Sequence, residues 1–223
     1  MKENIAHISI DDVTFVLQRL STCACDSIYN EPFFRYLHFL HRMFWLKITL
    51  YVYAQNGKWS LADIPERYKQ ELEEASSWLK FGFHAVSDEQ KENNIIANFE
   101  GAFIETSAQI ERFAGTKSVA RILRLHYWFY PQKYLEVLRN HGVRTILIKE
   151  GLQIESKGLN QWETNIRTEE DTIRQIFFKI SHHKHNQPLV VYTHEWALNK
   201  KNKVKFALTI ALLRLKGYQF VCE

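Results

Sequence analysis

Short apolar runs alternate along the chain with longer amphipathic segments. Runs in which apolar residues follow one another are typical of strands that are covered on both faces of a sheet. They predict strands at 5–10 (IAHISI), 44–53, 79–86, 120–128, 143–150, 188–194 and 218–222. The first of these runs ends directly at two adjacent carboxylates, Asp11 and Asp12.

The segments between these runs have the apolar spacing or the boundary residues of helices. Helices are expected at 61–79, 94–113, 131–142, 169–180 and 205–217. The segment 131–142, for example, starts with proline and ends with glycine. Alternating strands and helices predict an α/β fold with a parallel sheet, either closed into a barrel or doubly wound. No linker-like, repetitive or low-complexity stretch interrupts it, so we expect a single domain over residues 1–223.

Composition and charge are those of an ordinary globular protein, with 46% hydrophobic and 24% charged residues. The net charge of +4 is small and dispersed, so no nucleic-acid partner is expected. One dense basic run, 199–205 (NKKNKVK), is typical of a solvated loop or the start of a helix. Arg, Lys or His interrupts each apolar stretch well before the roughly 18 residues of a membrane span, so no span is expected.

The cysteines and the first residues favour a cytoplasmic location. Cys23, Cys25 and Cys222 leave at least one cysteine unpaired, and such sparse usage indicates a reducing compartment rather than a disulfide scaffold. Cys23 and Cys25 lack a second pair at zinc-site spacing, so we interpret them as structural. The opening MKENIAHISIDD runs from a charged start directly into a predicted strand, without a signal peptide.

Residues that could bind a metal or transfer a proton lie at or just after the ends of several predicted strands. They are Asp11 and Asp12 after the first strand, His84 and Asp88 around the end of the third, Arg124 and His126 in the fourth, and His194 at the end of 188–194. In parallel α/β proteins the carboxyl ends of the strands meet at one edge, so we expect these side chains to converge. Together they could bind a divalent cation and still leave an acid and a base.

Each of these residues also has a purely structural interpretation. Asp88, within Ser-Asp-Glu-Gln, fits a helix-start capping box, and His84 fits a hydrogen-bonded core histidine. His194 fits a helix cap, and Asp11–Asp12 fits a solvated turn. The histidines of SHHKHN, at 182, 183 and 185, precede their strand, so we expect them on a solvated loop at the opposite edge.

The order of these segments resembles the polysaccharide deacetylase family, the NodB-like carbohydrate esterases. The segments that carry the resemblance are SIDD, FHAVSD, LRLHYWFYPQKYLEVLRNHGVRTI, PLVVYTHEW and LRLKGYQFV, which span nearly the whole chain. The resemblance implies a distorted (β/α) barrel of about seven strands. It also implies a hydrolase that removes acyl groups, usually acetyl from amino sugars, with a divalent metal, zinc first among the candidates.

The resemblance implies a role for each residue that matches a family motif. Asp11 corresponds to the general base, Arg124 to the arginine that orients it, and His194 to the general acid. Asp12 and His84 correspond to metal ligands, and Asp88 stands where the family has its second metal histidine. A ligand set with two carboxylates is harder than the family's usual one, which leaves the identity of the metal open.

The segment after Arg124 departs from the family's Pro-Pro-Tyr-Gly. Only Tyr127 is retained, and His126 and Trp128 would reshape the substrate pocket, to which Trp196 would add a further aromatic face. The family also has an acidic residue after the fifth strand, for which Glu150 is the nearest candidate in this sequence.

Three functions are therefore considered for this chain. The first is metal-dependent hydrolysis of an acetylated carbohydrate. The second is a barrel that binds a carbohydrate or another partner and has lost its chemistry. The third is an amidase acting on a small non-sugar amide. The oligomeric state is left open.

Overall fold

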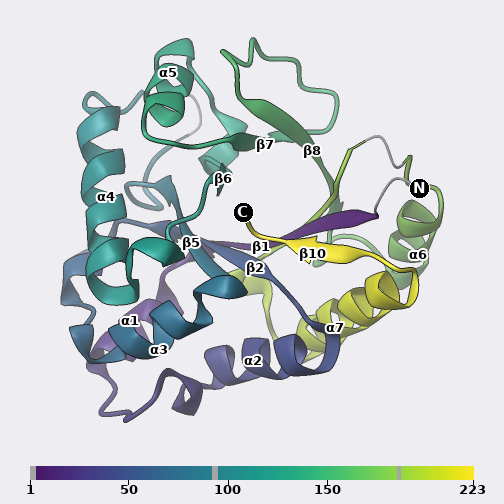
Figure 1. The fold of residues 1–223 in the computed structure, drawn as a ribbon, viewed down its shortest axis with the longest axis horizontal. Coiled ribbons are helices and arrows are strands. Elements are labelled where there is room, and N and C mark those ends of the chain that lie inside the picture. Colours follow the sequence, from purple (N-terminus) through teal and green to yellow (C-terminus); the bar gives the residue numbers. More distant parts are fainter. Residues whose placement is uncertain (1–3, 92–94, 185–186) are drawn as a thin grey trace.

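The computed structural model describes residues 4–91, 95–184 and 187–223, and its centre is a sheet of parallel strands (Figure 1). The strands of this sheet are β1 (Ile5–Val13), β2 (Ile48–Tyr53), β5 (Leu79–Ala85), β6 (Ile122–Leu123), β7 (Thr145–Lys149), β8 (Asn160–Arg167), β9 (Leu189–His194) and β10 (Gln219–Val221). A separate antiparallel hairpin pairs β3 (Gln55–Asn56) with β4 (Trp59–Ser60).

The sheet curls into a nearly closed barrel. Seven strands follow the order β5-β2-β1-β9-β8-β7-β6, and β10 pairs with the first residues of β1. The two ends of this order approach each other where Phe81 of β5 bridges to Val119, just before β6, and accepts a backbone hydrogen bond of 2.8 Å from Ala120. The predicted distorted (β/α) barrel is confirmed.

Helices cover the outside of the barrel (Figure 1). They are α1 (Phe15–Thr22), α2 (Pro32–Phe44), α3 (Lys69–Glu74), α4 (Phe99–Ala114), α5 (Gln132–Asn140), α6 (Ile173–Ser181) and α7 (Lys200–Leu215). Side chains cap several helix starts. Asn199 accepts a hydrogen bond from the backbone N–H of Asn202, so the basic run 199–205 begins a helix. No described helix is long and apolar enough to cross a membrane.

Several predicted boundaries were wrong. The strand expected at 120–128 is reduced to the two residues of β6, because the chain then turns through left-handed backbone at Tyr127 and Trp128, with φ of 56° and 52°. Helices α1 and α2 were missed, and α2 takes the start of the strand expected at 44–53. The helix expected at 61–79 is broken into α3 and short 3₁₀ turns. Strand β8 was not predicted at all.

Two further expectations concern single residues. Cys23 and Cys25 are joined in a disulfide, contrary to the expectation from sparse cysteine usage, and Cys222 is free and buried. Of the histidines expected on a solvated loop, His182 is exposed and follows α6, His183 is half-buried, and His185 lies outside the described residues. Asn94, the first residue of the helix expected at 94–113, and Met1 to Glu3 also lie outside them.

Strand β1 has apolar side chains on the face toward the helices and polar side chains on the opposite face, inside the barrel. Ala6, Ile8 and Ile10 belong to the core cluster that includes the helix residues packed on the sheet. His7 and Ser9 point to the opposite face, because successive side chains of a strand alternate. His7 is fully buried there, with Nδ1 3.1 Å from the carbonyl oxygen of Val221 and Nε2 3.2 Å from the hydroxyl of Tyr51.

The buried imidazole of His7 makes the free energy of unfolding depend on pH. Burial lowers the pKa of His7 to about 4, whereas the unfolded chain takes up this proton near pH 6.5. The stability due to neutral His7 is therefore complete above about pH 6.5 and is lost as the pH falls toward 4. The expected loss from this residue is about 2 kcal/mol at about pH 5.

Urea unfolding of the wild type and of His7→Gln between neutral pH and about pH 5 measures this contribution. The variant removes the titration, so its stability should fall less steeply with decreasing pH than that of the wild type. Equal slopes for the two proteins would show that His7 is not the titrating group.

Candidate active site

The end of β1 carries Asp11 and Asp12 and directs their side chains to different partners. The pairing of β1 with β2 shifts register between Ile10 and Val13, and Asp12 has left-handed backbone with φ of 57°. Few residues other than glycine adopt this conformation, aspartate more readily than most, and such backbone clusters at active sites. Asp11 is consequently fully buried in the barrel, whereas Asp12 keeps 15% of its side chain exposed.

Asp11 forms a buried ion pair with Arg124, which directly follows β6. The hydroxyl of Ser9 donates to the same carboxylate at 3.2 Å. The guanidinium carbon of Arg124 lies 4.2 Å from the ring centre of Trp128 and 4.3 Å from that of Tyr192. Burial lowers the pKa of Arg124 to about 10, so the side chain remains a cation at neutral pH and compensates the charge of Asp11.

Asp12, His84 and His126 bring three possible ligand atoms together. Nε2 of His84 lies 3.2 Å from Oδ1 of Asp12 and 3.2 Å from Nδ1 of His126. Nδ1 of His126 lies 3.6 Å from the same Asp12 oxygen. These residues offer one carboxylate oxygen and two imidazole nitrogens, all within 4.8 Å of one another.

The protonation of this cluster suits a cation. Nδ1 of His84 lies 2.6 Å from the backbone carbonyl of Arg124 and donates to it, so Nε2, which faces Asp12, is the nitrogen that would offer a lone pair to a cation once that cation displaces its proton. Burial, together with the nearby imidazole of His84, lowers the pKa of His126 to about 4, so this ring is neutral at neutral pH. Burial alone would raise the pKa of Asp12, but hydrogen bonding and charge from His84 outweigh it and hold the pKa well below its usual range.

Two further donors fix the carboxylate of Asp12. The hydroxyl of Tyr53 donates to Oδ1 at 2.6 Å, and the indole N–H of Trp196 donates to Oδ2 at 2.9 Å. These neutral donors orient the carboxylate without neutralising it. Its charge remains available to a cation.

His194 stands on the other side of Asp12 and is held by an acid that the sequence analysis missed. Nε2 of His194 lies 4.0 Å from Oδ2 of Asp12, while Nδ1 bonds the carboxylate of Glu169. Glu169 also accepts hydrogen bonds from Thr193 at 2.9 Å and Arg167 at 2.6 Å. Burial would raise the pKa of Glu169, but the bonds from His194 and Arg167 lower it to about 2.

Glu169 follows β8, and the failure to predict that strand explains why Glu169 was missed. Glu150, the acid considered from the sequence, is exposed and lines a different cavity. The available signal was the alternation of Trp162, Thr164 and Ile166, which predicts a half-buried strand that ends just before Glu169.

The structure brings five of the ten expected site residues to the wall of one cavity of about 360 Å³. It is lined by Asp12, Thr14, Phe15, Tyr53, Asn56, Asp88, His126, Tyr127 and Trp196. Tyr127 and Trp196 are strongly exposed at its rim. Trp128 does not line it and packs on Arg124 instead.

Asp88 lies on the wall of this cavity but outside the three-residue cluster. It is exposed, and no helix begins there, because α4 starts only at Phe99, so the capping-box interpretation was wrong. His126, which was expected in the substrate pocket, supplies the third ligand atom of the cluster. Whether Asp88 also binds a metal stays a prediction.

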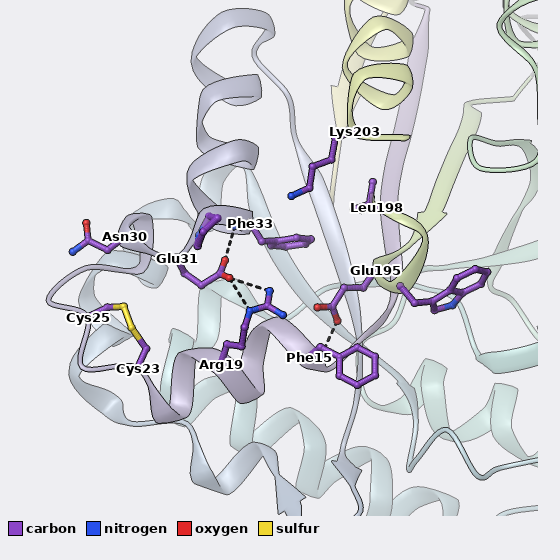
Figure 2. Close-up of a pocket in the computed structure, with 12 residues that line it drawn as sticks. Phe15, Arg19, Cys23, Cys25, Asn30, Glu31, Phe33, Glu195, Leu198 and Lys203 are labelled. Atoms are coloured by element: carbon purple, nitrogen blue, oxygen red, sulfur yellow. Dashed lines mark hydrogen bonds and ion pairs between the residues drawn. A yellow bond between two sulfur atoms is a disulfide. The ribbon is translucent and has the colours of Figure 1, made fainter. Parts of the chain in front are cut away.

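A second cavity of about 700 Å³ adjoins the first, because Phe15 and Trp196 line both. Figure 2 shows its wall, with the ion pair of Arg19 and Glu31 beside the Cys23–Cys25 disulfide. Glu195 points toward the start of α1 and accepts a hydrogen bond from the backbone N–H of Phe15 (Figure 2). It accepts two more from the backbone N–H groups of Thr14 and Val16, and the three bonds are 2.6–2.9 Å long. It thereby anchors the chain that follows Asp12 to the end of β9.

Comparisons with known proteins identify the fold. No family model and no curated protein matches the sequence. Among solved structures, a peptidoglycan N-acetylglucosamine deacetylase has a TM-score of 0.59 at 12% identity, over 98% of this chain and 86% of that one. An acetyl xylan esterase of family 4 from Clostridium thermocellum, in complex with a cobalt ion, has a TM-score of 0.53 at 14% identity, over 98% and 87%.

A pseudoenzyme of the CE4 family from Bacillus anthracis is also similar, with a TM-score of 0.57 at 10% identity, over 98% of this chain and 63% of that one. The fold is therefore shared by active and inactive proteins, and the residues of the site must decide between them. The chain has the NodB-like barrel of the CE4 polysaccharide deacetylases.

Proposed function

We propose that the protein is a metal-dependent deacylase that removes an acetyl group from an N-acetylated carbohydrate. The observation that carries this proposal is the cluster of Asp12, His84 and His126. It lies between two supported groups, the Asp11–Arg124 pair and the His194–Glu169 pair. A hydrolase needs such a set, because it must polarise the acyl group, activate water and protonate the leaving group.

Asp12, His84 and His126 would hold the cation. The ionised carboxylate, the Nε2 lone pair of His84 and the neutral ring of His126 form a mixed oxygen and nitrogen donor set, which fits zinc and related divalent transition metals. When bound, such a cation would polarise the acyl oxygen and make water a stronger acid.

The remaining residues move protons. Asp11 takes the proton of the attacking water, and Arg124 keeps this carboxylate ionised and fixed in place. Protonated His194 donates a proton to the leaving amine through Nε2, because Nδ1 is bonded to Glu169. Glu169 fixes the orientation of the ring through Nδ1, so that Nε2 faces Asp12 and the cavity.

The rim of the cavity suits a sugar. Tyr127 and Trp196 present exposed aromatic faces on which the apolar side of a sugar ring can pack. The adjoining cavity shares Trp196 and Phe15 and provides room for a neighbouring unit of the substrate. This extended space favours a carbohydrate over a small amide.

A second candidate function is a carbohydrate-binding barrel without turnover. The observation that favours it is the complete burial of Asp11, which does not line the cavity. The similarity in fold to a pseudoenzyme supports this alternative, because it shows that such a barrel can exist without activity. Metal content and turnover together distinguish the two functions.

The cation site is tested by metal analysis of purified protein supplied with zinc. Wild type should bind close to one equivalent, and Asp12→Ala and His126→Ala should lose it, because each removes one of three ligands. Asp88→Ala, which alters the same cavity outside the cluster, should retain it. Retention in His126→Ala and loss in Asp88→Ala would make Asp88 the third ligand instead.

The base is tested by Asp11→Asn, assayed on N-acetylated oligosaccharides, acetylated xylan and small amides. The variant should keep its metal and lower kcat about 10²–10⁴-fold, because general-base catalysis contributes that much. Glu105→Gln on the exposed face of α4 is the matched control and should leave kcat unchanged. Normal turnover by Asp11→Asn would refute the assignment. A metal-loaded wild type that turns over none of these substrates would favour the binding function.

A further inference from the structure

Helices α2, α6 and α7 form one side of the molecule, and their outward faces are unusually apolar. They lie along the lower right of Figure 1, where α7 packs against both neighbours. Of the fourteen large apolar residues that are exposed in the described part of the chain, nine lie on these helices or directly at the end of α2. They are Phe39, Met43, Trp45, Ile173, Phe177, Phe178, Val204, Leu208 and Leu215.

These nine residues do not lie on the sides of the helices that face the core. The buried side of α2 holds Phe34 and Leu37, and that of α7 holds Phe206 and Ile210. The opposite side of a surface helix is normally polar. A large apolar surface that is exposed to solvent marks an interaction site.

The same helices carry positive charge and no negative charge. Their sequences contain nine Lys and Arg residues and no Asp or Glu, so the rest of the chain is net negative although the whole chain is +4. The exposed cations on these helices are Arg35, Arg42, Arg174, Lys200 and Lys201. The only ion pair recorded for these helices among the described residues joins Lys179 to Asp171, outside α6.

Cations and aromatic rings connect the helices into one surface, here called the basic apolar face. The guanidinium of Arg214 on α7 lies 5.0 Å from the ring centre of Trp45 at the end of α2. The ammonium of Lys216, just after α7, lies 5.5 Å from the ring of Phe177 on α6. These two contacts therefore link α7 to the end of α2 and to α6.

We propose that the basic apolar face binds the surface of an anionic lipid membrane. Bulky apolar side chains interleaved with Lys and Arg are the pattern of helices that lie in a membrane interface, where apolar groups enter the acyl boundary and cations meet anionic headgroups. A second copy of the chain is a poor occupant, because a symmetric contact would place this positive face against itself. None of the nine apolar residues lines the cavity of the candidate active site.

The proposal is tested by flotation of the purified protein with vesicles of phosphatidylcholine alone and of phosphatidylcholine mixed with phosphatidylglycerol. We expect binding to the mixed vesicles that weakens with added salt. Arg42→Glu combined with Lys201→Glu should weaken binding at least about 25-fold, because each Lys or Arg near the membrane contributes about a factor of five.

The apolar contribution is tested by Phe178→Ser combined with Leu208→Ser, which should also reduce partitioning. The matched controls are Lys133→Glu on α5 and Ile104→Ser on α4, which are exposed on other helices and should bind as the wild type does. All these positions are exposed, and unchanged thermal unfolding would show that the variants fold.

Four results would overturn the proposal. One is the absence of binding to anionic vesicles. Another is equal loss of binding in the face and control variants. The third is binding to soluble poly-glutamate, but not to vesicles, through the same residues, which would identify an acidic protein surface as the occupant. The fourth is a dimer, detected by light scattering, that Leu208→Ser breaks, because a second copy of the chain would then be the occupant of this face.

Discussion

The site depends on one buried charge. Asp11 lies fully buried at the end of the polar side of β1, and removing the partner of such an ion costs about 3–5 kcal/mol. Arg124 must therefore remain within reach, and Trp128 and Tyr192 enclose its guanidinium. The carbonyl of Arg124 in turn accepts the Nδ1 proton of His84. One residue thus balances the buried carboxylate and sets the tautomer of a possible metal ligand.

The second constraint is the backbone of Asp12. A regular strand would send Asp11 and Asp12 to opposite faces, with one of them toward the helices. The register shift and the left-handed φ of Asp12 let its carboxylate reach the cavity instead. Glu195 holds the chain immediately afterwards by accepting three backbone N–H groups, which offsets part of the strain. The end of β9 thereby supports the end of β1 and also supplies His194.

The parts of the site that could be predicted lie at the ends of strongly apolar strands. Strands β1, β5 and β9 are continuous apolar runs, so the polar residues that end them stood out in the sequence, and the structure brings Asp12, His84 and His194 together. Glu169 escaped because β8 is half-exposed and has polar residues in alternate positions. The place of His126 depends on consecutive left-handed residues, Tyr127 and Trp128, which no propensity of tyrosine or tryptophan indicates. Tertiary contacts decide both cases.

Trp196 joins several of these features. Its indole N–H donates to Asp12, its ring stacks on that of His194 with the ring centres 5.1 Å apart, and 60% of the residue is exposed between the two cavities. Whatever changes the charge or position of Asp12 must also change the surroundings of this ring. Among the six tryptophans of the chain, this ring is therefore a built-in fluorophore whose emission would respond to the filling of the pocket in solution without an added label.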